Sequence, residues 1–171
     1  MAISNYSELK TAIASWLDRT DLTDIIPDFI ALAETRHKRD FKIRRMETRV
    51  TANTIDGSEF YTLPDDYVAM RNIKLNTDPK TPLEFLTPEI MDRLNAGSSK
   101  GTPKAYTIKG NNIELRPIPD SAYQIEVSYY KHFTALSDSN TTNDMLTHHP
   151  DIYLYGALVE AEPYLQNDKR I

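Results

Sequence analysis

The sequence has no cysteine among its 171 residues, which excludes disulfide frameworks, thiolate metal sites and cysteine nucleophiles. It has only five glycines, and these form neither a phosphate-cradling loop nor a dinucleotide-binding fingerprint. The longest uninterrupted apolar run, residues 29–33, is far too short to cross a bilayer. The first residues lack the basic and apolar regions of a signal peptide. We therefore expect a non-secreted, globular chain without membrane contact.

What the sequence does contain is enough for a packed core. Hydrophobic residues make up 40% of the chain, and ten tyrosines and five phenylalanines argue against disorder. The length fits one domain, or one domain carrying an inserted module. The net charge of −5 argues against a dedicated nucleic-acid binder.

The N-terminal part has the periodicity of helices. Apolar residues from Leu9 to Trp16 recur at spacings of three and four, and Ser7 is the predicted N-cap of this first helix. A second helix is predicted over residues 24–47, with Thr23 as its N-cap and Pro27 in its first turn. At 1.5 Å per residue it would be about 36 Å long.

The middle of the chain alternates as strands do. Strands are predicted at 49–55 and 59–63, joined as a hairpin by Asp56-Gly57. Another strand at 68–75 changes phase, which indicates a bulge near Arg71-Asn72. A short helix follows at 88–94, then a hairpin through Gly110-Asn111.

The last predicted strand, residues 123–129, places Tyr123, Ile125, Val127 and Tyr129 on one face. This pattern predicts an antiparallel sheet with one face on the core and the other in solvent. After a polar linker at 137–144, helical spacing returns at His149-Pro150-Asp151 and ends by Pro163.

The order of elements predicts an α+β fold. We expect residues 1–47 and 143–171 to form a helical bundle and residues 48–142 an inserted antiparallel β-domain. The tyrosines at 123, 129, 130, 153 and 155 are expected mostly in or near the core, although tyrosine also favours interfaces.

Nothing in the sequence has the pattern of an active site. The histidine cluster at 148–149 lacks the spacing of three or four that helical metal ligands need. Asp65-Asp66 stands in a turn context, and no serine has a nucleophile-elbow context. We expect no enzyme, no metal and no cofactor.

The conspicuous feature is a basic stretch. Residues 36–49 hold seven lysines or arginines against Asp40 and Glu47, in a chain that is acidic overall. The stretch has three interpretations: a solvated helix end whose cations complement the helix dipole, a surface for an acidic protein partner, or a DNA contact.

Strings along nearly the whole chain carry a resemblance. They are, in order, Tyr6-Ser7-Glu8-Leu9-Lys10, Trp16-Leu17-Asp18-Arg19, Ile26-Pro27-Asp28-Phe29-Ile30-Ala31-Leu32-Ala33-Glu34, Tyr61-Thr62-Leu63-Pro64-Asp65-Asp66-Tyr67, Pro82-Leu83-Glu84-Phe85, Thr87-Pro88-Glu89, Gly101 with Tyr106-Thr107-Ile108, Leu115-Arg116-Pro117-Ile118-Pro119-Asp120, Tyr129-Tyr130-Lys131, Pro150-Asp151-Ile152-Tyr153-Leu154-Tyr155-Gly156-Ala157-Leu158 and Glu160-Ala161-Glu162-Pro163-Tyr164-Leu165. With these strings the chain resembles the bacteriophage head-to-tail adaptor (connector) family, which includes the tail tubular protein A-like and tail accessory factor proteins.

The resemblance implies a structural virion protein made in the host cytoplasm and located at the neck. Such proteins form a ring, usually dodecameric, that binds beneath the portal protein after genome packaging. The ring receives a further tail protein, of the nozzle or tail-tube kind, and genomic DNA passes through its channel without sequence-specific binding. The family needs no cofactor and has no membrane partner.

A ring requires two complementary faces on each subunit. We expect the basic stretch to face an acidic surface of the neighbour that includes Glu160, Glu162 and Asp168. The candidate subunit or partner interface comprises the charged residues of these regions: Arg36, Lys38, Arg39, Lys42, Arg44, Arg45, Glu160, Glu162, Asp168, Lys169 and Arg170. Two alternatives remain open, namely a tail or capsid-associated module without portal contact and a DNA-binding protein that uses the basic helix.

Overall fold

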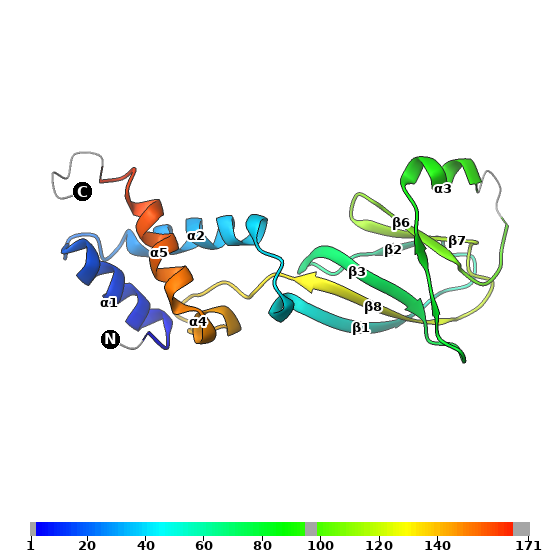
Figure 1. The fold of residues 1–171 in the computed structure, drawn as a ribbon, viewed down its shortest axis with the longest axis horizontal. Helices are drawn as coiled ribbons and strands as arrows, with labels where there is room; N and C mark the ends of the chain where they lie inside the picture. The colour runs from blue at the N-terminus through cyan, green and yellow to red at the C-terminus, as the bar shows by residue number, and fades with distance from the viewer. Residues whose placement is uncertain (1–2, 95–98, 166–171) are drawn as a thin grey trace. The chain divides into compact units, whose positions relative to one another are not determined.

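The computed structural model describes residues 3–94 and 99–165, and within them the fold is mixed α+β (Figure 1). The chain divides into two compact units, Met1–Arg45 with His132–Ile171 and Met46–Lys131. The segment 132–142 thus groups with the helices. That these units are a helical bundle and a domain inserted into it stays a prediction.

Four α-helices belong to the described part of the first unit. They are α1 (Tyr6–Leu17), α2 (Ile26–Asp40), α4 (Asp144–His148) and α5 (Pro150–Ala161). α5 begins at the proline that the sequence indicated and ends before Pro163, whereas α4 was not expected. The Asn143 side chain caps α4 by accepting a hydrogen bond from the Leu146 amide at 2.8 Å.

The predicted cap of α1 was wrong by two residues. Asn5, in extended conformation, accepts a hydrogen bond from the Glu8 amide at 2.9 Å, so the helix begins at Tyr6. Ser7 lies within the first turn, where its carbonyl accepts from the Thr11 hydroxyl.

The predicted start and end of the second helix were also wrong. Thr23 caps nothing, because its hydroxyl donates to the Thr20 carbonyl, and α2 begins at Ile26 without a side-chain cap. The helix ends at Asp40 rather than at residue 47, and Phe41 is extended. A short 3-10 helix, η1 (Arg44–Met46), follows, and from Glu47 the backbone is engaged in a sheet. The helical composition of residues 41–47 therefore yields one short 3-10 turn rather than a continued α-helix.

The core of the first unit combines both ends of the sequence. Its most buried side chains come from α1, α2, α4 and α5 and from the turn between α1 and α2, and include Leu9, Ile13, Leu22, Ile26, Ile30, Met145, Leu146 and Tyr153. Each such side chain contributes about 1.5–3 kcal/mol on burial. The four helices therefore stabilise one another through a shared apolar core.

The described residues of the second unit form eight strands and one α-helix. They are β1 (Glu47–Asn53), β2 (Phe60–Thr62), β3 (Tyr67–Leu75), β4 (Thr81–Pro82), β5 (Glu84–Phe85), α3 (Pro88–Leu94), β6 (Ala105–Lys109), β7 (Asn112–Arg116) and β8 (Gln124–Lys131). One sheet has the order β1-β8-β3-β4 and the other β2-β7-β6-β5. A single apolar core takes residues from both sheets, among them Ile73, Val127 and Leu115.

The Asp56-Gly57 turn exists, but the predicted hairpin does not. Gly57 has a φ of 76°, which turns the chain as expected. β1 then pairs with β8, and β2 pairs with β7 in the other sheet. The turn therefore carries the chain from one sheet to the other. The hairpin does not form because the strands that pair with β1 and β2 come much later in the sequence.

Other local predictions are confirmed. The register of β3 against β8 shifts between Met70 and Asn72, where the bulge was expected. α3 begins at Pro88, and β6 and β7 form the antiparallel hairpin through Gly110.

The predicted one-sided antiparallel sheet needs correction. The described strands form two sheets, and β5 pairs with β6 in parallel. Ile125, Val127 and Tyr129 face the core as expected, yet Glu126 on the opposite face is only 5% exposed. Lys74 Nζ lies 2.7 Å from Glu126 Oε1 and holds the pKa of that carboxyl below its usual range.

A second buried carboxylate, Glu114 on β7, is only 1% exposed. Arg116 Nε donates to its Oε1 at 2.9 Å, and Lys109 Nζ lies 2.8 Å from its Oε2. Lys109 also reaches Asp92 of α3 at 2.6 Å, and Arg116 reaches Glu59 at 2.8 Å. These ion pairs connect α3 to the outer face of the second sheet.

Glu114→Gln is expected to destabilise the second unit by about 2 kcal/mol, because two cations lose a buried charged partner. Asp92→Asn removes an exposed carboxylate from the same lysine and should change stability by about 0.5 kcal/mol or less. Hydrogen exchange of the β7 amides at low urea concentration measures the change in the free energy of unfolding for both variants. Equal effects of the two substitutions would show that burial of Glu114 contributes nothing.

Candidate interaction surface

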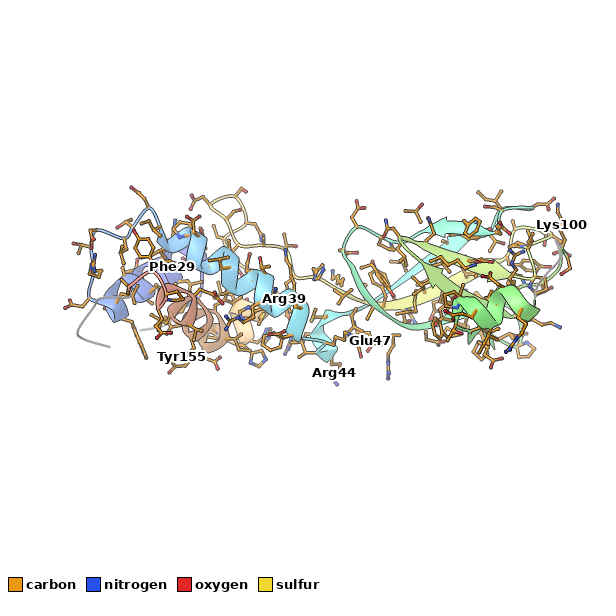
Figure 2. The ribbon with its side chains drawn as sticks, turned by 90° about the horizontal axis from the view of Figure 1, so that it is seen from above. Phe29, Arg39, Arg44, Glu47, Lys100 and Tyr155 are labelled. Atoms are coloured by element: carbon orange, nitrogen blue, oxygen red, sulfur yellow. The ribbon has the colours of Figure 1, made fainter. Side chains whose placement is uncertain are left out.

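Six of the basic residues predicted for the interface lie on the last turns of α2 and on the segment that follows it. Arg36, Lys38 and Arg39 are on the helix, and the others come after it. All six side chains are exposed. Figure 2 shows Arg39 on α2 and Arg44 beyond the end of that helix.

Two of the six basic residues are engaged within the chain. Arg36 Nη2 lies 2.7 Å from Glu160 Oε1, so α2 and α5 are joined by the two residues that the sequence analysis had assigned to different subunits. Arg45 Nη1 lies 3.3 Å from Asp144 Oδ1 at the start of α4. Partly exposed pairs of this kind contribute about 0–1 kcal/mol each.

Four predicted cations remain: Lys38, Arg39, Lys42 and Arg44. Among the described residues none of them forms an ion pair with a carboxylate. We call these four residues the cationic surface. Unpaired exposed cations at the C-terminal end of a helix interact favourably with the helix dipole. They also present positive charge to any partner.

The predicted acidic partners are only partly described. Glu162 is exposed directly after α5. Asp168, Lys169 and Arg170 lie outside the described residues, so their predicted role stays a prediction.

A buried polar network connects α2 to other elements of the first unit. Glu34, only 8% exposed, accepts hydrogen bonds on Oε1 from the Leu136 amide at 2.8 Å and from the Tyr153 hydroxyl at 3.1 Å. Asn143 Nδ2 donates to the Tyr153 oxygen at 2.7 Å. Burial raises the pKa of Glu34 and the pKa of Tyr153. The network ties α2 to α5 and to the segment that leads into α4.

His37, one turn after Ala33, fills the contact between α2 and α5. Its ring stacks on Phe41 and meets Tyr153 edge-on, with centroid distances of 5.1 and 5.6 Å. A Cβ at Gly156 would come within 2.9 Å of His37 Nε2, so the glycine permits this close approach. Burial first, and the Arg36 charge second, lower the pKa of His37.

The sequence analysis missed this network and misplaced one aromatic residue. Glu34 occupies a position on the apolar stripe of α2, and that position was the available signal. Tyr155 was expected in or near the core, but it is 55% exposed, and Trp16 is 59% exposed. Their rings meet edge-on at 5.7 Å, and Val159, one turn after Tyr155, is half exposed as well.

Within residues 3–94 and 99–165, no group of three His, Asp or Glu side chains is arranged to hold a metal ion. None of the helices there combines the length and apolarity that a membrane span requires.

A chain whose notable surface groups are unpaired cations and exposed aromatic rings fits the structural proteins that act by contact with other proteins. The sequence model of the SU10 adaptor protein family matches residues 4–170, and the chain belongs to that family. It is a phage structural adaptor, and the resemblance to head-to-tail adaptors is confirmed. No curated relative matches the chain.

His37 should make the first unit sensitive to acid. Because its pKa is lowered in the folded chain, the unfolded chain takes up the proton first, near pH 6.5. The stability that neutral His37 contributes is therefore present above pH 6.5 and is lost as the pH falls through the folded-state pKa. Urea unfolding monitored by Trp16, the single tryptophan, should show this loss in the wild type and less of it in His37→Gln.

The exposed His149 provides the control for this experiment, and His149→Gln should keep the wild-type dependence. Glu34 acts in the opposite direction: its raised pKa gives stability that is present below pH 4.5 and lost as the pH rises. The comparison of variants separates the two groups. Identical pH profiles for wild type and His37→Gln would contradict the prediction.

Proposed function

We propose that this protein is a head-to-tail adaptor that forms a ring beneath the portal protein and connects it to the tail. The observation that carries this proposal is the family match over residues 4–170. The proposed position is the neck of the virion, after synthesis in the host cytoplasm, with a nozzle or tail-tube protein as the next component. The role is structural, without catalysis or cofactor.

The proposed ring places the cationic surface against an acidic surface of the neighbouring subunit. Since Arg36 and Arg45 are engaged within the chain, we assign the intersubunit role to Lys38, Arg39, Lys42 and Arg44. Glu162 is the described candidate on the acidic side. The predicted residues 168–170 complete the proposed interface.

Charge complementarity suits such a contact because it fixes register and orientation more than it adds affinity. A ring also needs contacts between two different faces of the subunit. When these faces carry opposite charges, two identical faces repel each other and do not pair. The overall net charge of −5 would keep the channel from binding the passing DNA tightly.

The proposed contact predicts that the double variant Arg39→Glu with Arg44→Glu needs at least about tenfold more protein to form rings. The reason is that the attraction between the cationic surface and the acidic surface of the neighbour becomes repulsion. Arg93→Glu with Lys104→Glu is the matched control, since both residues are exposed and the change in net charge is the same. Negative-stain electron microscopy counts the portals that carry a ring. Normal rings from the first variant would remove the cationic surface from the interface.

The adaptor role itself is tested by electron microscopy of the wild-type chain with and without the portal from the same genome. Rings seated on the portal are the expected result. Failure to bind a portal that accepts other components would favour a tail or capsid-associated module without portal contact.

A second candidate function rests on the same four exposed cations. A DNA-binding protein that uses this surface would lose affinity steeply as salt rises, because binding releases counterions from the phosphates. Fluorescence anisotropy with duplex DNA at several salt concentrations distinguishes the two functions. If the protein is an adaptor, we expect its affinity for DNA to be weak. The double variant Arg39→Glu with Arg44→Glu should then change DNA affinity much less than it changes binding to the portal.

A further inference from the structure

Strand β1 forms one edge of the first sheet, and its outer side is unoccupied by any described strand. It pairs only with β8, in an unbroken register from Glu47 opposite Tyr130 to Asn53 opposite Gln124 (Figure 1). Six of its seven residues are exposed. Val50, on the core-facing side, still has 38% of its surface in solvent.

The backbone groups that point outward from β1 can be assigned from the ladder. The Thr54 amide donates to the Tyr123 carbonyl at 2.8 Å, which marks these two residues as a hydrogen-bonded pair. Because such pairs alternate along an antiparallel ladder, the N–H and C=O groups of residues 47, 49, 51 and 53 point away from β8. Four donors and four acceptors therefore line the open edge.

The other edges of the two sheets are protected, as natural sheet edges usually are. β2, β4 and β5 have only two or three residues each. The part of β3 that β4 leaves open contains two register shifts, between Tyr67 and Ala69 and between Met70 and Asn72. β1 alone is long, continuous and free of proline.

We propose that β1 pairs antiparallel with β1 of a second copy of this chain, with Val50 opposite Val50 at the two-fold axis. No other described edge of a second copy offers a straight run of this length, so β1 is the fitting partner for itself. The pairing joins the two first sheets into one and forms about eight hydrogen bonds, two for each of the four outward-facing pairs.

The side chains fit this register. The two Val50 side chains cover each other, and Thr48 lies opposite Ala52. On the other face, Arg49 lies opposite Thr51 and Glu47 opposite Asn53, so no like charges are directly opposed.

The two copies of Arg49 become diagonal neighbours, and each has a carboxylate of its own chain nearby. Arg49 Nη1 lies 3.7 Å from Oε1 of the buried Glu126. Lys74 Nζ at 2.7 Å and Lys80 Nζ at 3.8 Å share the same carboxylate, so it compensates only part of the positive charge on this face.

This inference does not rest on the adaptor function. A two-fold contact closes on itself, whereas a ring needs a different contact between neighbours. The pairing is thus a property of the free chain, and it covers an edge that would otherwise promote uncontrolled strand addition.

The test measures the oligomeric state by analytical ultracentrifugation and amide exchange at low and high concentration. We expect a monomer–dimer equilibrium in which the amides of residues 47, 49, 51 and 53 become protected as the dimer forms. A chain that stays monomeric, or a dimer in which these four amides exchange freely, overturns the proposal. Rings as the only associated species overturn it as well.

Thr51→Pro removes one outward amide without breaking a bond to β8 and should raise the dissociation constant at least about tenfold. Thr51→Val keeps the amide and is the matched control. Because a proline can disturb the strand, Val50→Lys provides an independent variant that places two like charges opposite each other. Dimers of unchanged affinity in both Thr51→Pro and Val50→Lys, with wild-type circular dichroism, would refute the pairing.

Discussion

The antiparallel pairing of β1 with β8 is the contact on which the organisation of this chain depends. β1 opens the second unit and β8 closes it, so the pair from Glu47 opposite Tyr130 brings both ends of that unit side by side. Only then can residues from before and after the β-rich segment meet in one helical core. The same pairing leaves β1 with one open edge.

Within the helical unit the corresponding constraint is a buried polar one. Glu34 accepts hydrogen bonds from the Leu136 amide and the Tyr153 hydroxyl, so it selects one arrangement of α2 against the C-terminal helices. A buried polar network whose members are hydrogen-bonded restricts the arrangements that the surrounding elements can adopt. Gly156 permits the close packing around His37, and the Arg36–Glu160 ion pair lies on the same two helices. The cations left unpaired are the ones available to partners.

The sequence predicted most elements whose signals are local. Proline at the first helical position located α3 and α5, a phase change located the bulge in β3, and alternation located the core face of β8. It failed where partners lie far apart in the chain. Asp56-Gly57 looks like a hairpin turn, but β1 and β2 join different sheets. The helical spacing of Tyr155 is typical of a core residue, but its side chain is 55% exposed.

For the interaction surface, the sequence by itself determined which residues carry charge. It also determined that the chain is a phage adaptor, because the family's characteristic strings can be recognised without the structure. Only the tertiary structure decided which charges are already engaged. Arg36 with Glu160 and Arg45 with Asp144 are separated by about a hundred residues or more, and no periodicity encodes such pairs. The same holds for the open edge of β1, since an edge is defined by the strands that do not pair with it.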